Sequence, residues 1–443
     1  MTRKEEFYKL WKRGIKLVED GRDKEAEPLL NDAATRFPDL WCALAVDLSK
    51  QGEDQISLTL AQRVLDLCKS NLARAGALNT VGLVFANKGY TEEGLQAFKE
   101  AHKLKPDDPD IMSNIALANR WLGNIKDAEH WLARALGKNP WMHEAEFERA
   151  LITLLKGDYK TGFERYECRF RSKNNGLPKI TAYCPEWDGT NGKKLFVYSE
   201  QGAGDAILMM RYAKLLKERG LFVSWAFQDS MVSLAESMGL IDHVFGAKET
   251  KEKFPDMDCH IPAFSLPRIF GTTIETIPPA PYIPWRFCDR RLGQFTVGIA
   301  WRGSVTQNND YIRSTSLAEW GPVLAVPGVM FESLQVDGAD EALLYPSIRT
   351  FQKPSNWLDT ATRLCGVDLV ITVDTSILHL AGAMGVPCWC AMHCRPYFVY
   401  PLTCEHTPWY PSVKLFKQNK AGEWKPVFER IAYELARNNK THD

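Results

Sequence analysis

The sequence lacks several features that would assign a class of protein at once. None of its segments approaches the ~18 uninterrupted apolar residues of a membrane-spanning helix, and its charged start does not resemble a secretory signal. The charges balance at 55 Lys+Arg and 55 Asp+Glu, which disfavours a strongly basic nucleic-acid-binding protein and a disordered acidic tail but not a local basic groove. We therefore expect a cytoplasmic protein, whose 443 residues predict two or three domains.

A disulfide framework and a zinc site are also disfavoured. The 11 cysteines are odd in number and include no Cys-x-x-Cys pair, which favours reduced thiols. One group near the C-terminus contains ligand types that bind zinc: Cys388, Cys390, His393, Cys394, Cys404 and His406. Cys388 and Cys390 would lie on one face of a strand, which makes a compact tetrahedral site with Cys394 hard to form. Buried thiols are the favoured interpretation, and no metal cofactor is expected.

An internal repeat runs through residues 1–171. Pro106 and Pro140 are separated by the 34-residue tetratricopeptide (TPR) period. Residues recur at the same offsets before Pro38, Pro106 and Pro140, namely Gly14, Leu17, Ala26, Leu30 and Ala33, then Gly82, Phe85, Gly94, Phe98 and Ala101, then Ala116, Asn119, Ala128, Leu132 and Ala135. The spacing predicts a TPR α-solenoid with repeats near 7–40, 41–74, 75–108 and 109–142 and a fifth half-repeat over 157–170. An unrelated helical bundle is the alternative. A solenoid offers a surface for an acceptor or partner protein and carries no chemistry itself.

The rest of the chain has the pattern of an α/β fold. Residues 172–194 have the composition of a linker, and short apolar runs then alternate with helical stretches, which predicts a mainly parallel sheet. Strands are expected at 195–198, 221–227, 296–300, 329–334, 368–373 and 387–392, and helices at 205–219, 357–364 and 376–384. The proline-dense stretch 277–284 suits a connection between two Rossmann-like halves, 195–284 and 285–443, the second ending in a C-terminal helix. A cleft between such halves, at the carboxyl ends of the strands, is the expected site.

The first polar segment, Glu200 to Asp205, follows a strand and opens a helix. Gly202 and Gly204 permit a tight turn with the backbone close to a ligand. Asp205 is suited to act as a general base, and a helix N-cap is an equally good interpretation. A dinucleotide fingerprint needs a glycine where the sequence has Ile207, which argues against a nucleotide-cofactor oxidoreductase.

The second segment, 301–314, follows the strand expected at 296–300. It contains Trp301, Arg302, Arg313 and Ser314. A guanidinium pairs with phosphate bidentately, so these arginines suit an anionic ligand, whereas a solvated loop with surface arginines is the alternative. Gln335, directly after the strand expected at 329–334, is counted with the same donor-binding residues.

The third segment opens the helix expected at 376–384. Asp374 ends a strand, and Thr375 and Ser376 begin a short helix whose N–H groups and hydroxyls suit a diphosphate. His379 lies one turn further and can reach the same ligand. The alternative for His379 is a buried histidine whose hydrogen bonds are satisfied.

These segments together resemble a known family. The motifs are Glu-Gln-Gly-x-Gly-Asp at 200–205, Trp-x-Gly at 301–303 with Arg-Ser at 313–314, and Asp-Thr-x-x-x-His-Leu-Ala-Gly-Ala-x-Gly-x-Pro at 374–387. In this order they resemble the bacterial TPR glycosyltransferases whose catalytic part is similar to the heptosyltransferases of family 9. The resemblance covers about 150–435 in addition to the repeats, and the layout is also similar to the protein O-GlcNAc transferases.

The resemblance implies a GT-B fold and an inverting, metal-independent transfer from a nucleotide-diphosphate sugar. It implies that Asp205 is the base, that Arg313 and Ser314 face the donor diphosphate, and that His379 lies near the donor ribose or sugar. The chain departs from the family at Gly303-Ser304, where relatives often have Gly-Asn, and over 394–400, where relatives tend to be acidic and rich in tryptophan. The donor nucleotide and sugar are therefore not implied, and the acceptor can be a protein, a glycan, a lipid-linked sugar or a nucleic-acid base.

Two other interpretations stay open. A non-catalytic TPR adaptor with a degenerate transferase domain is the alternative function. The pattern Asp256-Met257-Asp258 matches the metal-binding Asp-x-Asp motif of the other large glycosyltransferase class, but this pattern is short and common.

Overall fold

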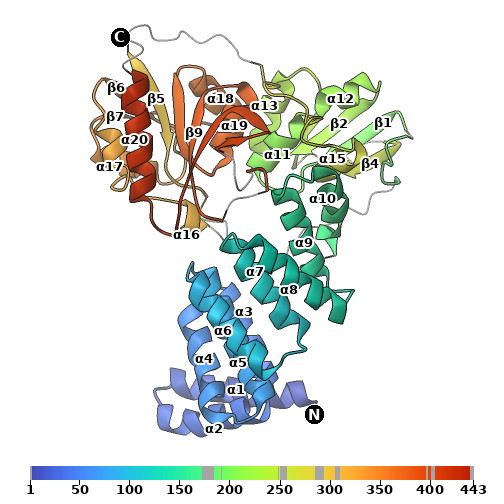
Figure 1. Ribbon diagram of the computed structural model, residues 1–443, viewed down its shortest axis with the longest axis vertical. Coiled ribbons are helices and arrows are strands. Elements are labelled where there is room, and N and C mark those ends of the chain that lie inside the picture. The colour runs from blue at the N-terminus through green and yellow to red at the C-terminus, as the bar shows by residue number, and fades with distance from the viewer. Residues whose placement is uncertain are drawn as a thin grey trace. The chain divides into compact units, whose positions relative to one another are not determined.

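The computed structural model describes residues 2–171, 184–190, 192–247, 249, 257–284, 294–304, 310–395, 398–400 and 405–439 (Figure 1). By its contacts the chain divides into two compact units, Met1–Arg149 and Ala150–Asp443. The domain borders expected at 171 and 194 stay a prediction, because most of the segment between them lies outside the described residues.

The first unit consists of helix pairs, as the 34-residue period predicts. The helices are α1 (Arg3–Glu19), α2 (Asp23–Arg36), α3 (Pro38–Lys50), α4 (Asp54–Leu67), α5 (Asn71–Asn87), α6 (Thr91–Leu104), α7 (Pro109–Trp121) and α8 (Ile125–Lys138), with α9 (His143–Leu155) crossing the border. Gly82, one of the recurring residues, lies where paired helices touch: a Cβ placed on Gly82 of α5 would lie 2.5 Å from the Phe98 ring of α6. Helices α2, α6 and α8 end at Arg36, Leu104 and Lys138, each two residues before Pro38, Pro106 or Pro140. Pro38 also opens α3, where a missing N–H is tolerated.

The second unit begins with short helical segments and a four-stranded parallel sheet. The segments are α10 (Tyr159–Tyr166) and η1 (Glu167–Phe170), and the strands β1 (Lys194–Tyr198), β2 (Phe222–Phe227), β3 (His243–Gly246) and β4 (Cys259–Pro262) follow in the spatial order β3-β2-β1-β4. Its other helices are α11 (Ala203–Met210), α12 (Ala213–Glu218), η2 (Asp229–Met231), α13 (Val232–Ser237), η3 (Ala263–Ser265) and α15 (Leu266–Ile269). The single helix expected over 205–219 is therefore two helices, α11 and α12, separated by Arg211 and Tyr212.

Asp258 of the Asp-x-Asp pattern has a structural role at the start of β1. Its carboxylate accepts the backbone N–H groups of Lys193 at 2.7 Å and Lys194 at 2.9 Å. These two hydrogen bonds hold the pKa of Asp258 below its ordinary value. Asp256 lies outside the described residues.

A second sheet has seven strands in the order β10-β11-β9-β8-β5-β6-β7, and every pair is parallel except β10 with β11. The strands are β5 (Phe295–Ala300), β6 (Val329–Ser333), β7 (Ile348–Arg349), β8 (Leu369–Val373), β9 (Cys388–Met392), β10 (His406–Thr407) and β11 (Tyr410–Lys417). The helices are α16 (Asp310–Arg313), α17 (Gly321–Leu324), η4 (Ala339–Leu344), α18 (Trp357–Leu364), α19 (Ser376–Met384) and α20 (Lys425–Asn439). All six predicted strands are present across the two sheets, and α18 and α19 have the predicted bounds.

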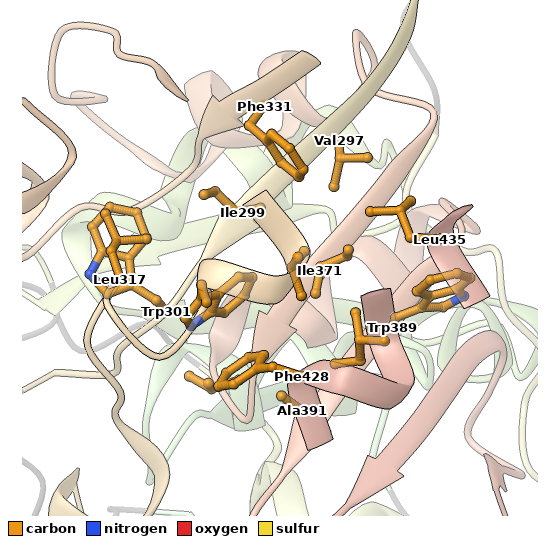
Figure 2. Packing of buried hydrophobic residues seen from close by; sticks show 14 of the residues in the cluster. Val297, Ile299, Trp301, Leu317, Phe331, Ile371, Trp389, Ala391, Phe428 and Leu435 are labelled. Atoms are coloured by element: carbon orange, nitrogen blue, oxygen red, sulfur yellow. The ribbon is translucent and has the colours of Figure 1, made fainter. Parts of the chain in front are cut away.

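The core of the second sheet lies between its strands and α20. Figure 2 shows Val297, Ile299 and Ile371 of the central strands near Phe428 and Leu435 of α20, and all five side chains are buried. This packing fixes β5 and β8, from whose carboxyl ends the second and third polar segments emerge. None of the helices in the described part of the chain combines the length and the apolar composition needed to cross a membrane.

Candidate functional site

The structure brings the first and third predicted segments together at the starts of two helices. Helices α11 and α19 pack against each other within the second unit (Figure 1). A Cβ placed on Gly204 would lie 2.8 Å from Cδ2 of His379 and 3.3 Å from Oγ of Ser376. The close neighbour of Gly204 is therefore the first turn of α19, and the predicted approach of the backbone to a ligand stays a prediction.

Asp205 lies in the first turn of α11, for which Gly202 is the N-cap. The carboxylate folds back toward the cap, since its Oδ2 lies 3.8 Å from a Cβ placed on Gly202. A carboxylate at this position is stabilised by the helix dipole. Asp205 is also partly exposed, so its surroundings are compatible with the predicted base role, which stays a prediction.

Two hydrogen bonds hold Arg313 near the start of α19. Its Nε donates to Oδ1 of Asp310 at 3.3 Å, and its Nη1 donates to the backbone carbonyl of Asp374 at 3.3 Å. A Cβ placed on Gly303 would lie 2.5 Å from Nη2 of Arg313, so the glycine of the Trp-x-Gly motif leaves room for the guanidinium. Arg313 is 21% exposed, which fits a ligand contact better than a freely solvated side chain.

Ser314 lies in the same cluster, but its hydroxyl is hydrogen-bonded to other residues of the protein. Its Oγ donates to Oδ1 of Asp310 at 2.7 Å and accepts the N–H of Gly303 at 2.8 Å. The structure therefore brings the second segment beside the third, and it gives Ser314 the task of fixing the loop that carries Arg313.

Trp301 and Gln335 are buried and support this cluster from inside the protein. The Trp301 side chain is buried in the core (Figure 2), and its Nε1 donates to Glu341 at 2.7 Å. The side chain of Gln335 accepts the N–H groups of Trp301 and Arg302 at 2.9 Å and 3.1 Å, and it donates to the carbonyl of Arg302 at 3.0 Å. The Trp301 side chain is fully buried, so it has no exposed atom that could make the predicted donor contact. Gln335 holds the backbone of the loop around Arg302.

His379 lies in a buried network with two tyrosines and Asp374. Its Nδ1 is 3.1 Å from the hydroxyl of Tyr410, and its Nε2 is 3.3 Å from the hydroxyl of Tyr400. Tyr400 also donates to Oδ1 of Asp374 at 3.0 Å, and Nε2 of His393 lies 3.5 Å from Oδ2 of Asp374. The arrangement matches the alternative of a buried, satisfied histidine, because both ring nitrogens of His379 already have partners.

The protonation states follow from this burial. Burial lowers the pKa of His379 from 6.5 to about 4, with the Asp374 charge opposing the shift, so the ring is neutral at neutral pH. For Asp374, burial favours the protonated form, but the hydrogen bond to His393 and the nearby Arg313 guanidinium outweigh it. The pKa of Asp374 is therefore lowered and its carboxylate is ionised.

We expect this histidine to make the fold sensitive to mild acid. A histidine whose pKa falls on folding contributes its full stability above the pKa of about 6.5 in the unfolded chain, and it loses that stability as the pH falls toward 4. Between about pH 7 and about pH 4.5, the free energy of unfolding, measured with denaturant, should fall by about 2–3 kcal/mol more in the wild type than in His379→Gln. Equal losses in the two proteins would show that the pKa of His379 is not lowered on folding.

Thr375 and Ser376 begin α19 as predicted. The Oγ1 of Thr375 accepts the N–H of Ile377 at 3.3 Å and lies 3.1 Å from Oγ1 of Thr372, so Thr375 is the N-cap of the helix. Ser376 is the first helical residue and faces the Gly204 turn. The N-terminus of α19 thus combines a capped first turn, the hydroxyl of Ser376 and the nearby guanidinium of Arg313.

Sequence reasoning missed the residues that support this cluster from other elements. Tyr400, Tyr410 and His393 surround Asp374 and His379, and Arg211 and Arg169 are fully buried arginines with several partners each. Tyr410 fits against α19 because Gly382 has no Cβ. A buried arginine carries no signal in a single sequence, since its burial depends on partners far along the chain.

No metal site is formed by the residues that the structure describes, since no three His, Cys, Asp or Glu side chains gather there as possible ligands. Cys388 and Cys390 are free and buried, and burial raises the pKa of both thiols. Cys404 lies outside the described residues.

Comparisons with known proteins give relatives rather than a family. No protein-family model matches the chain. The chain is 28% identical over 398 residues to Protein FlbA of Caulobacter vibrioides, an alignment that covers 81% of this chain and 66% of FlbA. It is 30% identical over 132 residues to the TPR repeat-containing protein PA4667 of Pseudomonas aeruginosa, with 26% of this chain and 22% of that protein covered. The chain thus spans less than two thirds of the length of either curated relative.

Among solved structures, the chain is similar to an O-GlcNAc transferase mutant of Thermobaculum terrenum. That similarity has a TM-score of 0.35 at 12% identity and covers 91% of this chain and 92% of the other. The chain is also similar to pilF of Pseudomonas aeruginosa, with a TM-score of 0.30 at 19% identity over 49% of this chain and 87% of pilF. Scores this low carry no argument about fold or chemistry. The function must therefore be argued from the residues of this chain.

Proposed function

We propose that this protein is a glycosyltransferase that moves a sugar from a nucleotide-diphosphate sugar to an acceptor hydroxyl. The proposal takes the two sheets of the second unit as the halves of a GT-B fold and the helical repeats as the recruiter of an acceptor or partner protein. The observation that carries it is the convergence of Asp205, Arg313 and the first turn of α19, which come from the ends of three different parallel strands.

The chemistry needs positive potential where the leaving diphosphate gains charge. The start of α19 supplies oriented backbone dipoles and the Ser376 hydroxyl, and the Arg313 guanidinium lies against the carbonyl of Asp374 immediately before it. Because Asp310 and Asp374 hold Arg313 by hydrogen bonds, little reorganisation is needed when the diphosphate binds.

The other requirement is a group that takes the acceptor proton. Asp205 is the carboxylate on the opposing turn, and its partial exposure leaves it accessible to an acceptor hydroxyl. An in-line displacement at the anomeric carbon would then invert the sugar, with Asp205 on one side and the diphosphate on the other. In this proposal His379 holds Tyr400 and Tyr410 in place and makes no direct donor contact.

The donor side can be tested by binding alone. We expect calorimetry with UDP, GDP and ADP to find at least one nucleoside diphosphate that binds the wild type, and Arg313→Gln to weaken that binding by about 10- to 100-fold, as for loss of a charged hydrogen bond. Arg349→Gln is the matched control, because Arg349 on the edge strand β7 pairs with Glu332 at 3.4 Å and is 45% exposed. Equal binding by the wild type and Arg313→Gln would remove Arg313 from the donor site, and absence of binding by all three nucleotides would favour a non-catalytic adaptor.

A further inference from the structure

One buried charge cluster connects the end of the helical segment to the turn that carries Asp205. Arg169 of η1 is 0% exposed, and its Nε and Nη2 both donate to Oε1 of Glu200, at 3.0 Å and 2.7 Å. Glu200 is itself 1% exposed and is the first residue of the Glu-Gln-Gly-x-Gly-Asp motif. Ionised groups this deeply buried persist only when they are paired and hydrogen-bonded, so the contact constrains both chain segments.

Additional contacts complete the coordination of Arg169. Its Nη1 donates to Oε1 of Glu167 at 2.8 Å, and its Nη2 donates to Oγ of Ser265 at 3.0 Å. The Ser265 hydroxyl donates in turn to Glu167 at 2.8 Å. The guanidinium lies 4.1 Å from the centre of the Phe170 ring. Arg169 is therefore fixed by hydrogen bonds in several directions, and a side chain without the guanidinium fork cannot replace it.

The residue after Glu200 is attached to the same helical segment. Gln201 donates through Nε2 to the hydroxyl of Tyr166 at 3.0 Å. Burial raises the pKa of Tyr166 to about 12, and the charges of Asp205 and Glu200 add to that rise, which indicates that Asp205 lies near this tyrosine. The turn from Glu200 to Asp205 is thus held at one end by η1 and α10, and at the other by the packing of Gly204 against α19.

Helix α10 packs against aromatic side chains of the second unit that lie far from it in the sequence. The Tyr166 ring lies 5.9 Å from Phe264 and 5.8 Å from Phe398, measured between ring centres. Phe163 of the same helix lies 5.8 Å from Phe398 and 6.1 Å from Trp409. These contacts hold α10 and η1 firmly in the second unit, so the two helical segments can support the Glu200 turn.

We propose that Arg169 is a positioning residue, which acts through Glu200 to hold the turn that carries Asp205 in its productive place. The proposal rests on the proposed function, in which Asp205 is the base. It predicts that loss of Arg169 slows turnover and spares donor binding, since the donor groups Arg313 and α19 are held by other residues. The last helical turn before residue 171 is then part of the catalytic machinery rather than a passive end of the repeats.

The test compares Arg169→Met with Arg165→Met in the full chain. Arg165 lies on α10, where its Nη1 donates to Oγ1 of Thr153 at 2.9 Å, so its loss removes a neighbouring arginine and one hydrogen bond. We expect Arg169→Met to lower kcat by about 10- to 100-fold, a part of the full effect of a general base, with the donor KM changed less than about twofold. Arg169→Lys should recover part of kcat, because it retains the charge opposite Glu200, and Arg165→Met should keep kcat within about twofold of wild type. Equal losses in Arg169→Met and Arg165→Met, or a donor KM that rises as much as kcat falls, would overturn the proposal.

A second measurement does not depend on activity. Hydrogen exchange of the amides over 201–206 should be faster in Arg169→Met than in the wild type and in Arg165→Met. Glu200→Gln, which keeps the shape of the side chain, should show the same local effect if Arg169→Met does not fold. Unchanged exchange in that segment would overturn the positioning role. If the wild type proves inactive with every donor while exchange responds as expected, the proposed function fails and the structural link between Arg169 and the turn remains.

Discussion

Asp205→Asn is expected to reduce sugar transfer by about 10²- to 10⁴-fold while leaving nucleotide binding within about twofold of wild type. The reason is that asparagine keeps the size of Asp205 in the first turn of α11 but cannot accept the acceptor proton. The donor groups, Arg313 and the start of α19, are unchanged by the substitution. The measurement is steady-state transfer in parallel with calorimetry of the nucleoside diphosphate.

The control is Glu236→Gln, which removes one exposed carboxylate from α13. Helix α13 contacts β3 of the four-stranded sheet, which also contains β1. Glu236→Gln should turn over like the wild type. Full turnover by Asp205→Asn would exclude Asp205 as the base and would leave stabilisation of the first turn of α11 as its role. Loss of nucleotide binding together with turnover would instead place Asp205 on the donor side.

Arg211→Met is expected to lower the free energy of unfolding of the second unit by about 2–4 kcal/mol. Arg211 separates α11 from α12 in the sequence. Its guanidinium is buried, and its nitrogens donate to the carbonyls of Leu208 at 2.9 Å, Pro278 at 3.1 Å and Trp409 at 3.1 Å. Its centre lies 4.9–5.0 Å from the rings of Tyr282, Trp409 and Tyr410. Methionine fills much of the volume but leaves those carbonyls without their donor, and the cation–π contacts disappear. Removing the buried cation also removes its desolvation cost, which keeps the expected loss below the sum of the separate terms.

Arg219→Met provides the comparison for Arg211. Arg219 also lies over an aromatic ring, 4.3 Å from the centre of Phe270, and it donates to the carbonyl of Gly189 at 3.1 Å, but it is exposed. Arg219→Met should lower the free energy of unfolding, measured with denaturant, by less than about 1 kcal/mol. If the two substitutions cost the same, the buried contacts of Arg211 do not stabilise the second unit beyond what a surface contact provides.

The local elements of the fold were predictable because their signals are local. Strand β8 is a continuous apolar run that is buried at every position, and α19 has its polar N-cap Thr375 and its left-handed Gly385 at the ends that the sequence indicates. The short strands β3 and β4 were not predicted, since four residues carry too little pattern to distinguish them from loops. The division of 205–219 into α11 and α12 was also missed, because the pattern continues through Arg211, whose partners Pro278 and Trp409 lie far along the chain.

The candidate site was predictable to a similar degree. Gly303 and Arg313 were placed in one loop by sequence, and the structure explains the glycine by the guanidinium that occupies the space of its missing side chain. The sequence did not indicate that His379 has a tyrosine hydroxyl at each ring nitrogen or that Trp301 is a core residue. These differences arise from tertiary contacts between separate strand ends, for which a single sequence has no local signature.

The central claim is that a nucleotide-diphosphate sugar loses its sugar at this site. The most direct measurement is the release of nucleoside diphosphate from UDP-, GDP- and ADP-sugars by the full chain in the presence of EDTA, with Arg313→Gln and Asp205→Asn alongside. We predict release from at least one donor by the wild type, undiminished by the chelator and strongly reduced in both variants. If no donor is consumed by the wild type, or if both variants release nucleotide at the wild-type rate, the proposed glycosyltransferase site is contradicted.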